Sequence, residues 1–395
     1  MAKIVLGLQS TVDYEIVWHP QVIQDLVDSY GVVASQLACP PPVTDSRSLL
    51  VNLLARMQRD EGGEVLVSDS DVIEDFAGHF EVTITLGGTG LRAGIAMRVL
   101  GLTALLHLVS TDEHTRRLLP AGMPVICSAE HDTLDPHGIV QYPAGATVEL
   151  PDAVVVTHHP NRVIFTNDPP ARDLVISRAL GQEVAQAEAF LVSGLNAIDD
   201  GDVLRERLAS LTEIAARVPA GGLVMYEDAG FHVPRLRADV AGPVSAMVDV
   251  YSMNEDELSA YLERPVDLLD PADVVAAIGE LRAQVTAPTV VVHSKYWALS
   301  HGPQAGRYRE SLDGGITMAS TRYIYGDGFD AEDYLRTASL PRSPAGARAA
   351  QGIERLAADI VCVPGRSLSA AKATTIGLGD TFVGGFIAAY LGATA

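Results

Sequence analysis

The chain has 395 residues, 48% of them hydrophobic, which is enough for one large α/β domain and a smaller one around a sizeable core. Its formal net charge of -22 argues against nucleic acid as a partner, because affinity for a polyphosphate backbone depends on clustered Lys and Arg. Three widely spaced cysteines with no Cys-x-x-Cys pair suggest neither a disulfide framework nor a zinc site.

A short apolar run at residues 4–8 opens the chain and is predicted as a first strand rather than a signal leader. No apolar segment approaches the length of a membrane span, so we expect a cytoplasmic protein without a membrane partner. Asp13 and Glu15 follow the predicted strand. Ligands bind beyond the carboxyl ends of strands in open α/β sheets, which makes both residues candidates, although a turn capped by Asp13 explains the pattern as well.

Two less regular stretches follow, with the predicted strand 82–86 between them. Residues 20–78 mix helical patterns at 22–30 and 49–59 with a short strand, and residues 125–156 carry short alternating runs bounded by Pro and Gly. The alternating runs predict antiparallel hairpins. Together the two stretches are expected to form a smaller domain over the edge of a sheet.

A glycine-rich turn after the strand at residues 82–86 carries a competing hypothesis. Gly88, Gly90 and Ala93 satisfy the Gly-x-Gly-x-x-Ala spacing of dinucleotide-binding turns, and Asp112 follows about 20 residues later. A nicotinamide-binding Rossmann unit is therefore a second hypothesis. Such fingerprints also arise by chance in glycine-rich α/β chains, and this one is internal instead of opening the fold.

Apolar strands alternate with helical patterns from residue 189 onward. Long apolar strands separated by helices predict an α/β fold with a mostly parallel sheet covered on both faces. Asn196 and Glu227 lie at predicted strand ends, where functional residues gather. The predicted strands are 189–193, 223–226, 246–252 and 289–293, and the predicted helices are 203–217, 255–262 and 274–285.

Asn254 and Glu257 have the spacing of a capping box, in which the Asn caps a helix and the Glu reaches back to the cap N–H. This structural role is compatible with a functional one at the same place. The sequence contains three lysines and none follows a glycine, so a P-loop is absent and phosphate must be held by backbone N–H groups and arginines.

The most informative stretch lies near the end of the chain, where Thr-Ile-Gly-Leu-Gly-Asp-Thr-Phe precedes an apolar run. Gly377 and Gly379 allow a tight turn, and the run has the length of a buried helix, so Asp380 is predicted at or near a helix N-terminus. Free N–H groups and the helix dipole would there hold a phosphate beside a carboxylate able to act as general base. An ordinary turn with an Asp cap has the same features.

The stretch from Gly377 to Asp380 resembles the Gly-x-Gly-Asp signature of ribokinase-like kinases. The wider pattern resembles the ADP-dependent glucokinase/phosphofructokinase family of that superfamily, on short motifs that occur in the same order: Asp13, Gly87-Gly88, Asn254-x-x-Glu257, residues 293–297 and Asp380. The resemblance implies a ribokinase-like three-layer sandwich with a mostly parallel central sheet and a smaller α/β lid. The lid would comprise residues 14–78 and 123–171, and the large nucleotide-binding domain residues 1–13, 79–122 and 172–395.

The resemblance also implies roles for single residues. Asp380 would deprotonate the acceptor hydroxyl, while the N–H groups of Gly377, Leu378 and Gly379 stabilise the transferred phosphoryl group. The remaining implied residues are Asp13, Glu15, Gly87, Gly88, Arg162 and Asn196 for the sugar, His293, Lys295, Tyr296, Gly377 and Gly379 for the nucleotide, and Glu227, Asn254 and Glu257 for Mg²⁺ or another divalent cation.

The chain departs from the family pattern at two places. The His-x-Glu metal motif of the family would fall at Met225 to Glu227, so its His is missing. Gly88 is followed by Thr89-Gly90 rather than by the usual Asn or Gln. The first departure concerns the metal and the second the choice of sugar.

These residues together predict a kinase of carbohydrate metabolism, of the glycolytic type, that transfers the terminal phosphoryl group of ADP to a sugar or sugar phosphate and leaves AMP. Glucose and fructose 6-phosphate represent the expected acceptor class, and a monomer or small homo-oligomer is expected. Two alternatives stay open. One is an NAD(P)-dependent oxidoreductase using Gly88, Gly90 and Ala93, and the other is a catalytically silent sugar-binding relative.

Overall fold

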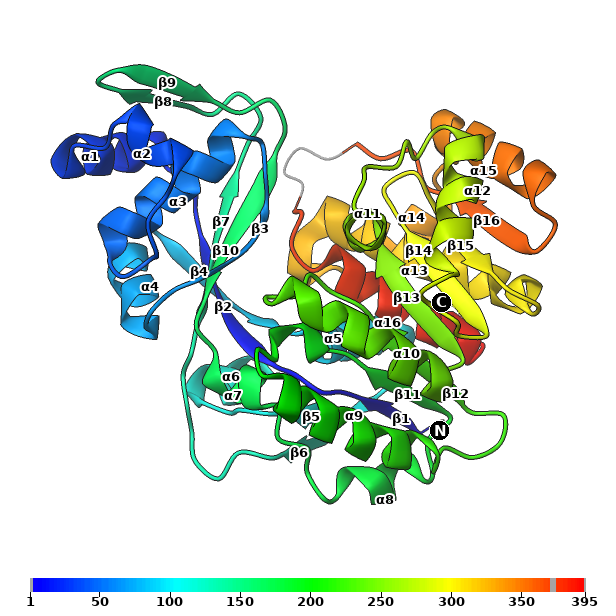
Figure 1. Cartoon of the computed structure of the whole chain (residues 1–395). Coiled ribbons are helices and arrows are strands. Elements are labelled where there is room, and N and C mark those ends of the chain that lie inside the picture. The colour runs from blue at the N-terminus through cyan, green and yellow to red at the C-terminus, as the bar shows by residue number, and fades with distance from the viewer. Residues whose placement is uncertain (1–2, 370–373, 394–395) are drawn as a thin grey trace.

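The computed structural model describes residues 3–369 and 374–393 (Figure 1). Within these ranges the strands form a nine-stranded sheet, a five-stranded sheet and a two-stranded hairpin. The two larger sheets lie in two parts of the molecule, as Figure 1 shows.

The large sheet has the strand order β16-β15-β14-β13-β12-β11-β1-β5-β6. Neighbouring strands from β6 through β14 pair parallel, whereas β15 pairs antiparallel with both β14 and β16. The expected mostly parallel sheet is therefore confirmed. Its strands are β1 (Ile4–Leu6), β5 (Ala104–Leu108), β6 (Val125–Cys127), β11 (Ala189–Val192), β12 (Leu223–Glu227), β13 (Val250–Asn254), β14 (Thr289–His293), β15 (Trp297–His301) and β16 (Ile360–Pro364).

Helices cover both faces of the large sheet because its strands alternate apolar side chains toward each face. Val290 and Val292 pack into one core and Val291 into the other, as the period of two in a strand requires. The result is the expected three-layer sandwich. One face carries α8 (Leu180–Val184), α9 (Gly201–Ala215), α10 (Arg237–Met247), α11 (Glu255–Leu262), α12 (Pro271–Leu281) and α15 (Pro344–Leu356), and the other carries α5 (Thr89–Met97), α13 (Arg309–Tyr325) and α16 (Leu378–Tyr390).

Helix α16 is packed closely between α13 and α5. A Cβ on Gly385 of α16 would lie 2.3 Å from the carbonyl oxygen of Gly314 in α13, so the two backbones touch where these glycines meet. Residues 381–388 of α16 are buried throughout. This packing fixes the position of the first turn of α16, which carries Asp380.

The small sheet has the order β3-β10-β7-β2-β4. A separate core lies between one of its faces and α1 to α4 with the β8–β9 hairpin, and the other face is turned toward the large part of the molecule (Figure 1). Its elements are β2 (Thr11–Ile16), α1 (Pro20–Tyr30), α2 (Ala34–Ala38), α3 (Ser46–Gln58), β3 (Gly63–Leu66), α4 (Ser70–Ala77), β4 (Val82–Gly87), β7 (His137–Tyr142), β8 (Thr147–Leu150), β9 (Ala153–Val156) and β10 (Asn161–Thr166).

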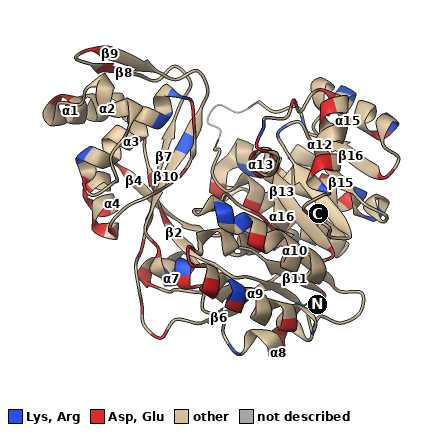
Figure 2. Cartoon of the chain, viewed as in Figure 1, with Lys and Arg blue, Asp and Glu red and all other residues tan. Residues whose placement is uncertain are grey.

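Short helices connect these elements. They are α6 (Glu113–Leu118), α7 (Pro169–Asp173), α14 (Ala331–Ala338) and the 3₁₀ turns η1 (Arg98–Leu100), η2 (Leu195–Ala197), η3 (Pro234–Leu236), η4 (Ala305–Tyr308) and η5 (Gly326–Gly328). Among the described residues, none of the helices is both long and apolar enough to cross a membrane. Figure 2 shows acidic residues over both parts of the molecule, on α4 and α9 for example.

Two predictions of local structure are wrong, and a third is correct only in part. Asp13 and Glu15 lie within a second strand, β2, instead of in a turn after the first, because residues 11–16 pair with β4 and their polar side chains have partners on one face of the small sheet. In residues 125–156 the predicted antiparallel pairing holds for the β8–β9 hairpin and for β7 with β10, but β7 also pairs parallel with β2, and β6 pairs parallel with β5. The strand predicted at 246–252 begins at Val250, since residues 246 and 247 still belong to α10.

The sheets divide the chain at different places from the expected domain boundaries. β4 belongs to the small sheet although residues 79–122 were assigned to the large domain, and β6 belongs to the large sheet although residues 123–171 were assigned to the lid. We propose that the lid consists of the small sheet with α1 to α4 and the β8–β9 hairpin.

Candidate active site

Helix α16 begins at the glycine turn that was predicted to bind phosphate. Gly377 is the N-cap, with φ 66° and ψ 22°, and Asp380 is the third helical residue, as expected. The left-handed conformation favours glycine, and the first N–H groups of any helix have no partner within it. The N–H groups of Leu378 and Gly379 thus have no partner within the helix, and such groups can bind an anion beside the carboxylate of Asp380.

A buried arginine lies between Asp380 and the lid. Arg92, on α5, is only 5% exposed, and its Nη2 lies 2.7 Å from Oδ2 of Asp13 on β2. Its Nε lies 3.8 Å from Oδ2 of Asp380. Sequence reasoning missed Arg92, although a single cation inside the run Gly-Leu-Arg-Ala-Gly-Ile-Ala was a signal that a charge is buried there.

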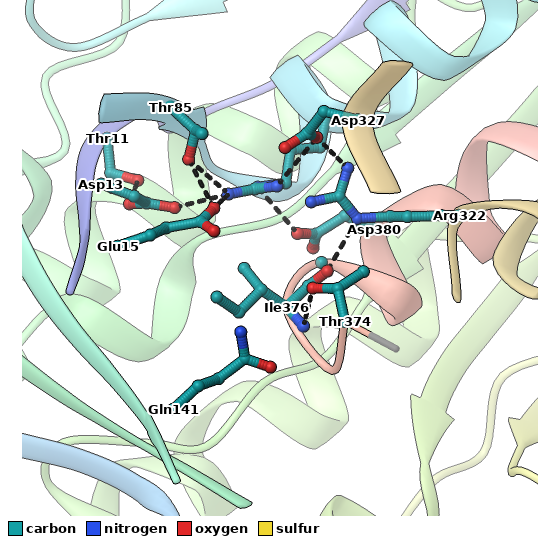
Figure 3. A network of polar contacts seen from close by, with 12 residues as sticks. Thr11, Asp13, Glu15, Thr85, Gln141, Arg322, Asp327, Thr374, Ile376 and Asp380 are labelled. Atoms are coloured by element: carbon teal, nitrogen blue, oxygen red, sulfur yellow. Dashed lines mark hydrogen bonds and ion pairs between the residues drawn. The ribbon is translucent and has the colours of Figure 1, made fainter. Parts of the chain in front are cut away.

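Further polar groups surround this arginine (Figure 3). Glu15 Oε1 lies 3.6 Å from Arg92 Nη2 and accepts a 2.7 Å hydrogen bond from Thr85 Oγ1. Burial raises the pKa of Glu15 above its ordinary value, and the hydrogen bond from Thr85 and the charge of Arg92 offset that effect only in part. Asp327 on η5 lies 3.8 Å from Arg92 Nη1. Four carboxylates thus converge on one guanidinium.

The register of the small sheet explains why the acceptor candidates share a face. Asp13 on β2 pairs with His137 on β7, and Gln141 on β7 pairs with Arg162 on β10. Residues two apart on a strand project to the same side, so Glu15 joins this set. The predicted sugar residues Asp13, Glu15 and Arg162 therefore lie on the face that is turned toward α16.

Gly87 leaves the space that the acceptor candidates occupy. It ends β4 opposite Thr11, and a Cβ there would lie 2.1 Å from Thr11 Oγ1 and 2.4 Å from Oδ2 of Asp13. Its neighbour Gly88 is the N-cap of α5, and a Cβ there would lie 2.6 Å from the carbonyl oxygen of Gln9. Both predicted glycines are needed for close packing at the site.

The lid also contacts the loop that leads into α16. Oε1 of Gln141 accepts hydrogen bonds from the N–H of Thr375 at 3.1 Å and from its Oγ1 at 2.9 Å. On the other side Arg322 of α13 donates from Nε to the carbonyl of Ile376 at 2.7 Å. Figure 3 labels Gln141, Arg322 and Ile376 around this loop. The turn at Gly377 is thus held from both parts of the molecule.

A second polar group lies at the carboxyl ends of β12 and β14. Nε2 of His293 donates to Oε1 of Glu227 at 2.8 Å, and the imidazole stacks on Phe382 with 4.3 Å between ring centres. A Cβ on Gly379 would lie 3.4 Å from Cε1 of His293 and 4.0 Å from Oε1 of Glu227. His293, expected at the nucleotide, therefore lies beside the turn at Gly377 to Gly379.

A histidine does contact Glu227, although it does not come from the position that the family motif predicts. Met225, where the His-x-Glu motif would have its His, is a buried core residue. The imidazole beside Glu227 comes instead from His293 on a strand two positions away in the sheet. No local sequence pattern could have paired these two residues, because 66 positions separate them.

Asn254 and Glu257 form the predicted capping box at the start of α11. Oδ1 of Asn254 accepts from the N–H groups of Asp256 at 2.7 Å and Glu257 at 3.1 Å, and Oε2 of Glu257 accepts from the N–H of Asn254 at 2.8 Å. Burial, reinforced by the charges of Asp228 and Glu227, raises the pKa of Glu257 well above its ordinary value. A divalent cation nearby would favour the ionised form.

The donor set fits a magnesium ion that arrives with a nucleotide. Within the part of the chain that the structure describes, no group of three or more His, Cys, Asp or Glu side chains is placed to hold a metal, and Oε2 of Glu227 is buried without a hydrogen-bond partner. Mg²⁺ usually takes only one or two carboxylates and completes its shell with water and substrate phosphates. Glu227 with Glu257 matches that requirement.

Three predicted residues have other partners. Lys295 and Tyr296 lie in the turn between β14 and β15, where Nζ of the exposed lysine is 5.0 Å from the centre of the Tyr296 ring. Asn196 on η2 donates from Nδ2 to the carbonyl of Gly230 at 3.3 Å. That loop leads to His232, which contacts Glu64 of the lid.

The Rossmann hypothesis is wrong. Strand β4, before the Gly88 turn, pairs antiparallel with β2 in the small sheet, whereas β5 after the helix belongs to the large sheet, so the segment is not a parallel βαβ unit. Asp112 is the N-cap of α6 and accepts from the N–H and Oγ1 of Thr115 at 2.9 Å each. Both oxygens of the Asp112 carboxylate therefore accept hydrogen bonds within the first turn of α6.

A three-layer α/β sandwich with a lid sheet, and with an aspartate on the first turn of a buried helix after a glycine turn, defines the ribokinase-like class of kinases. The sequence model described as ADP-specific phosphofructokinase/glucokinase conserved region matches residues 2–294. The chain therefore belongs to the family of ADP-dependent sugar kinases, as the sequence resemblance predicted.

Solved structures agree with this fold. A hypothetical ADP-dependent phosphofructokinase from Pyrococcus horikoshii OT3 has a TM-score of 0.75 at 18% identity, with 99% of this chain and 98% of that chain covered. A phosphofructokinase from the same organism with AMP has a TM-score of 0.73 at 18% identity and the same coverage. An ADP-dependent kinase in complex with fructose-6-phosphate and ADPβS has a TM-score of 0.74 at 14% identity, covering 98% and 93%. A search of curated proteins returns no match.

Proposed function

We propose that this protein transfers the terminal phosphoryl group of ADP to a hydroxyl group of a sugar or sugar phosphate, with Asp380 as the general base. The observation that carries the proposal is the position of Asp380. It lies on the first turn of α16 beside free N–H groups, and the same arginine approaches its carboxylate and that of Asp13 on the lid.

In the proposed reaction the proton of the acceptor hydroxyl passes to Asp380 while the N–H groups of Gly377, Leu378 and Gly379 stabilise charge on the transferred group. General-base action typically contributes about 10² to 10⁴ in rate. One oxyanion donor contributes about 10² to 10³, so the two parts are needed together. Asp13 and Glu15 would accept hydrogen bonds from sugar hydroxyls, and Arg162 on the same face would hold a phosphate on a sugar phosphate.

Glu227 and Glu257, with Asn254 holding the latter in place, would bind Mg²⁺ or another divalent cation directly or through water. When bound, the cation neutralises charge on the phosphates of the nucleotide. The unpartnered Oε2 of Glu227 and the buried carboxyl of Glu257 support this assignment.

Glu257→Gln tests the metal role separately from the capping role. The amide oxygen of Gln can still accept the N–H of Asn254, so we expect thermal stability to change little. Loss of a metal-shell charge should raise the Mg²⁺ concentration for half-maximal rate about 10- to 100-fold. A magnesium titration of initial rates measures this, and an unchanged dependence would reduce Glu257 to a helix cap.

The donor is tested by titrating ADP and ATP against glucose and fructose 6-phosphate with saturating Mg²⁺. We expect AMP as product and a higher kcat/KM for ADP, because a nucleotide longer by one phosphate would have to shift its adenine when its last phosphate lies at the Gly377 turn. Equal or better kcat/KM for ATP contradicts the ADP assignment. Sugar binding without turnover would identify a silent relative instead.

A further inference from the structure

Arg92 joins three elements that belong to different parts of the fold. It projects from α5, and its guanidinium reaches Asp13 on β2 of the lid, Asp380 on α16 and Asp327 on η5. Its side chain is only 4% exposed. A cation buried to this degree must be matched by fixed negative groups, and here those groups include the proposed base and a proposed acceptor ligand.

The shape of the guanidinium matters as well as its charge. Nε and Nη2 form one edge of the planar fork, an edge that often binds a single carboxylate with two hydrogen bonds. In this protein the two nitrogens of that edge face different carboxylates: Nη2 lies 2.7 Å from Asp13 and Nε lies 3.8 Å from Asp380. A lysine ammonium is a point charge on a flexible stem and cannot hold two carboxylates at fixed places in this way.

The two contacts differ in length, and the difference suits their roles. The contact to Asp13 is a short hydrogen bond, which fixes that carboxylate. The contact to Asp380 is too long for a hydrogen bond, so the carboxylate is attracted without having its lone pairs occupied. Its side chain is 25% exposed and remains open to an acceptor hydroxyl.

The stem of the arginine also contacts the phosphate-binding turn. A Cβ on Gly377 would lie 2.8 Å from Cδ of Arg92, so the turn packs directly on the side chain. Arg92 therefore contacts the turn that would hold the phosphoryl group, the base that would accept the proton and the carboxylate that would bind the acceptor.

We propose that Arg92 is a positioning residue that aligns Asp380 with Asp13 for phosphoryl transfer, an inference that rests on the proposed function. It would not touch the reacting atoms. Its effect would be geometric, because displacement of a reacting group by about 1 Å can cost about 10² in rate.

Arg92→Lys tests this, since it retains the charge and removes the fork. We expect kcat to fall by about 10², while the ADP dissociation constant and the thermal midpoint stay close to those of the wild type. The matched control is Arg98→Lys. Arg98 is half-buried and begins η1, directly after α5, and this substitution should leave kcat unchanged. In an Asp380→Asn background, Arg92→Lys should cause no further loss.

A second variant, Arg92→Ala, is assayed with and without guanidinium ions at concentrations well below those that unfold the protein. Recovery of kcat by guanidinium, and not by ammonium, supports positioning by the fork. Wild-type kcat in Arg92→Lys, or a parallel loss of kcat, ADP affinity and thermal midpoint, overturns the inference. A wild-type protein that transfers no phosphoryl group from ADP overturns the proposed function as well.

Discussion

Asp380→Asn should lower kcat by about 10² to 10⁴ and leave the ADP dissociation constant nearly unchanged. The substitution preserves the size of the side chain and the backbone N–H groups of the α16 turn, so phosphate binding has no reason to fail. The amide of Asn cannot accept a proton from a hydroxyl at neutral pH. The measurement is kcat at saturating ADP, Mg²⁺ and acceptor, with calorimetric titration of ADP beside it.

Removing Asp380 also removes a favourable charge at a helix N-terminus, worth about 0.3–1 kcal/mol. Asp333 controls for this effect, because it is likewise the third residue of its helix, α14, and its side chain contacts Asp330 and Arg336 instead of a residue of the proposed site. Asp333→Asn should have a comparable effect on stability and none on kcat. Wild-type turnover by Asp380→Asn with the true acceptor would show that Asp380 is not the base.

Residues whose role depends on their immediate neighbours were predictable from the sequence. The glycine turn, the place of Asp380 on a helix start and the capping box of Asn254 with Glu257 each need only a few consecutive residues. The parallel sheet was likewise predictable from the apolar runs of β11 to β14, because strands that are buried on both faces have nearly continuous hydrophobic sequences.

Residues whose role depends on a distant partner were not predictable in the same way. Arg92 contacts Asp13, which is 79 positions away in the sequence, and His293 contacts Glu227, which is 66 positions away. The pairing of β2 with β4, the strand that leads into α5, creates the first contact. The local structure of Asp13 was predicted wrongly, because a strand with one polar face resembles a polar turn in sequence.

The acceptor site can be disturbed with a single methyl group. In Gly87→Ala the new Cβ would lie 2.1 Å from Thr11 Oγ1 and 2.4 Å from Oδ2 of Asp13, distances that no packed structure tolerates. Both side chains are buried, and Asp13 is held by Arg92, so neither can move aside freely. We expect Asp13 to be displaced, with a loss of about 1–3 kcal/mol of stability from overpacking.

The kinetic consequence of Gly87→Ala should be confined to the acceptor. The kcat/KM for the sugar should fall by about 10², because Asp13 loses its place relative to Asp380. The ADP dissociation constant should hold, since α16 and its N–H groups lie outside the clash. Gly242→Ala is the matched control: it lies in α10 with no atom within 4 Å of the new Cβ, and it should stabilise the protein by about 0.4–1 kcal/mol without a kinetic effect. Wild-type kcat/KM for the sugar in Gly87→Ala would mean that Asp13 does not bind the acceptor.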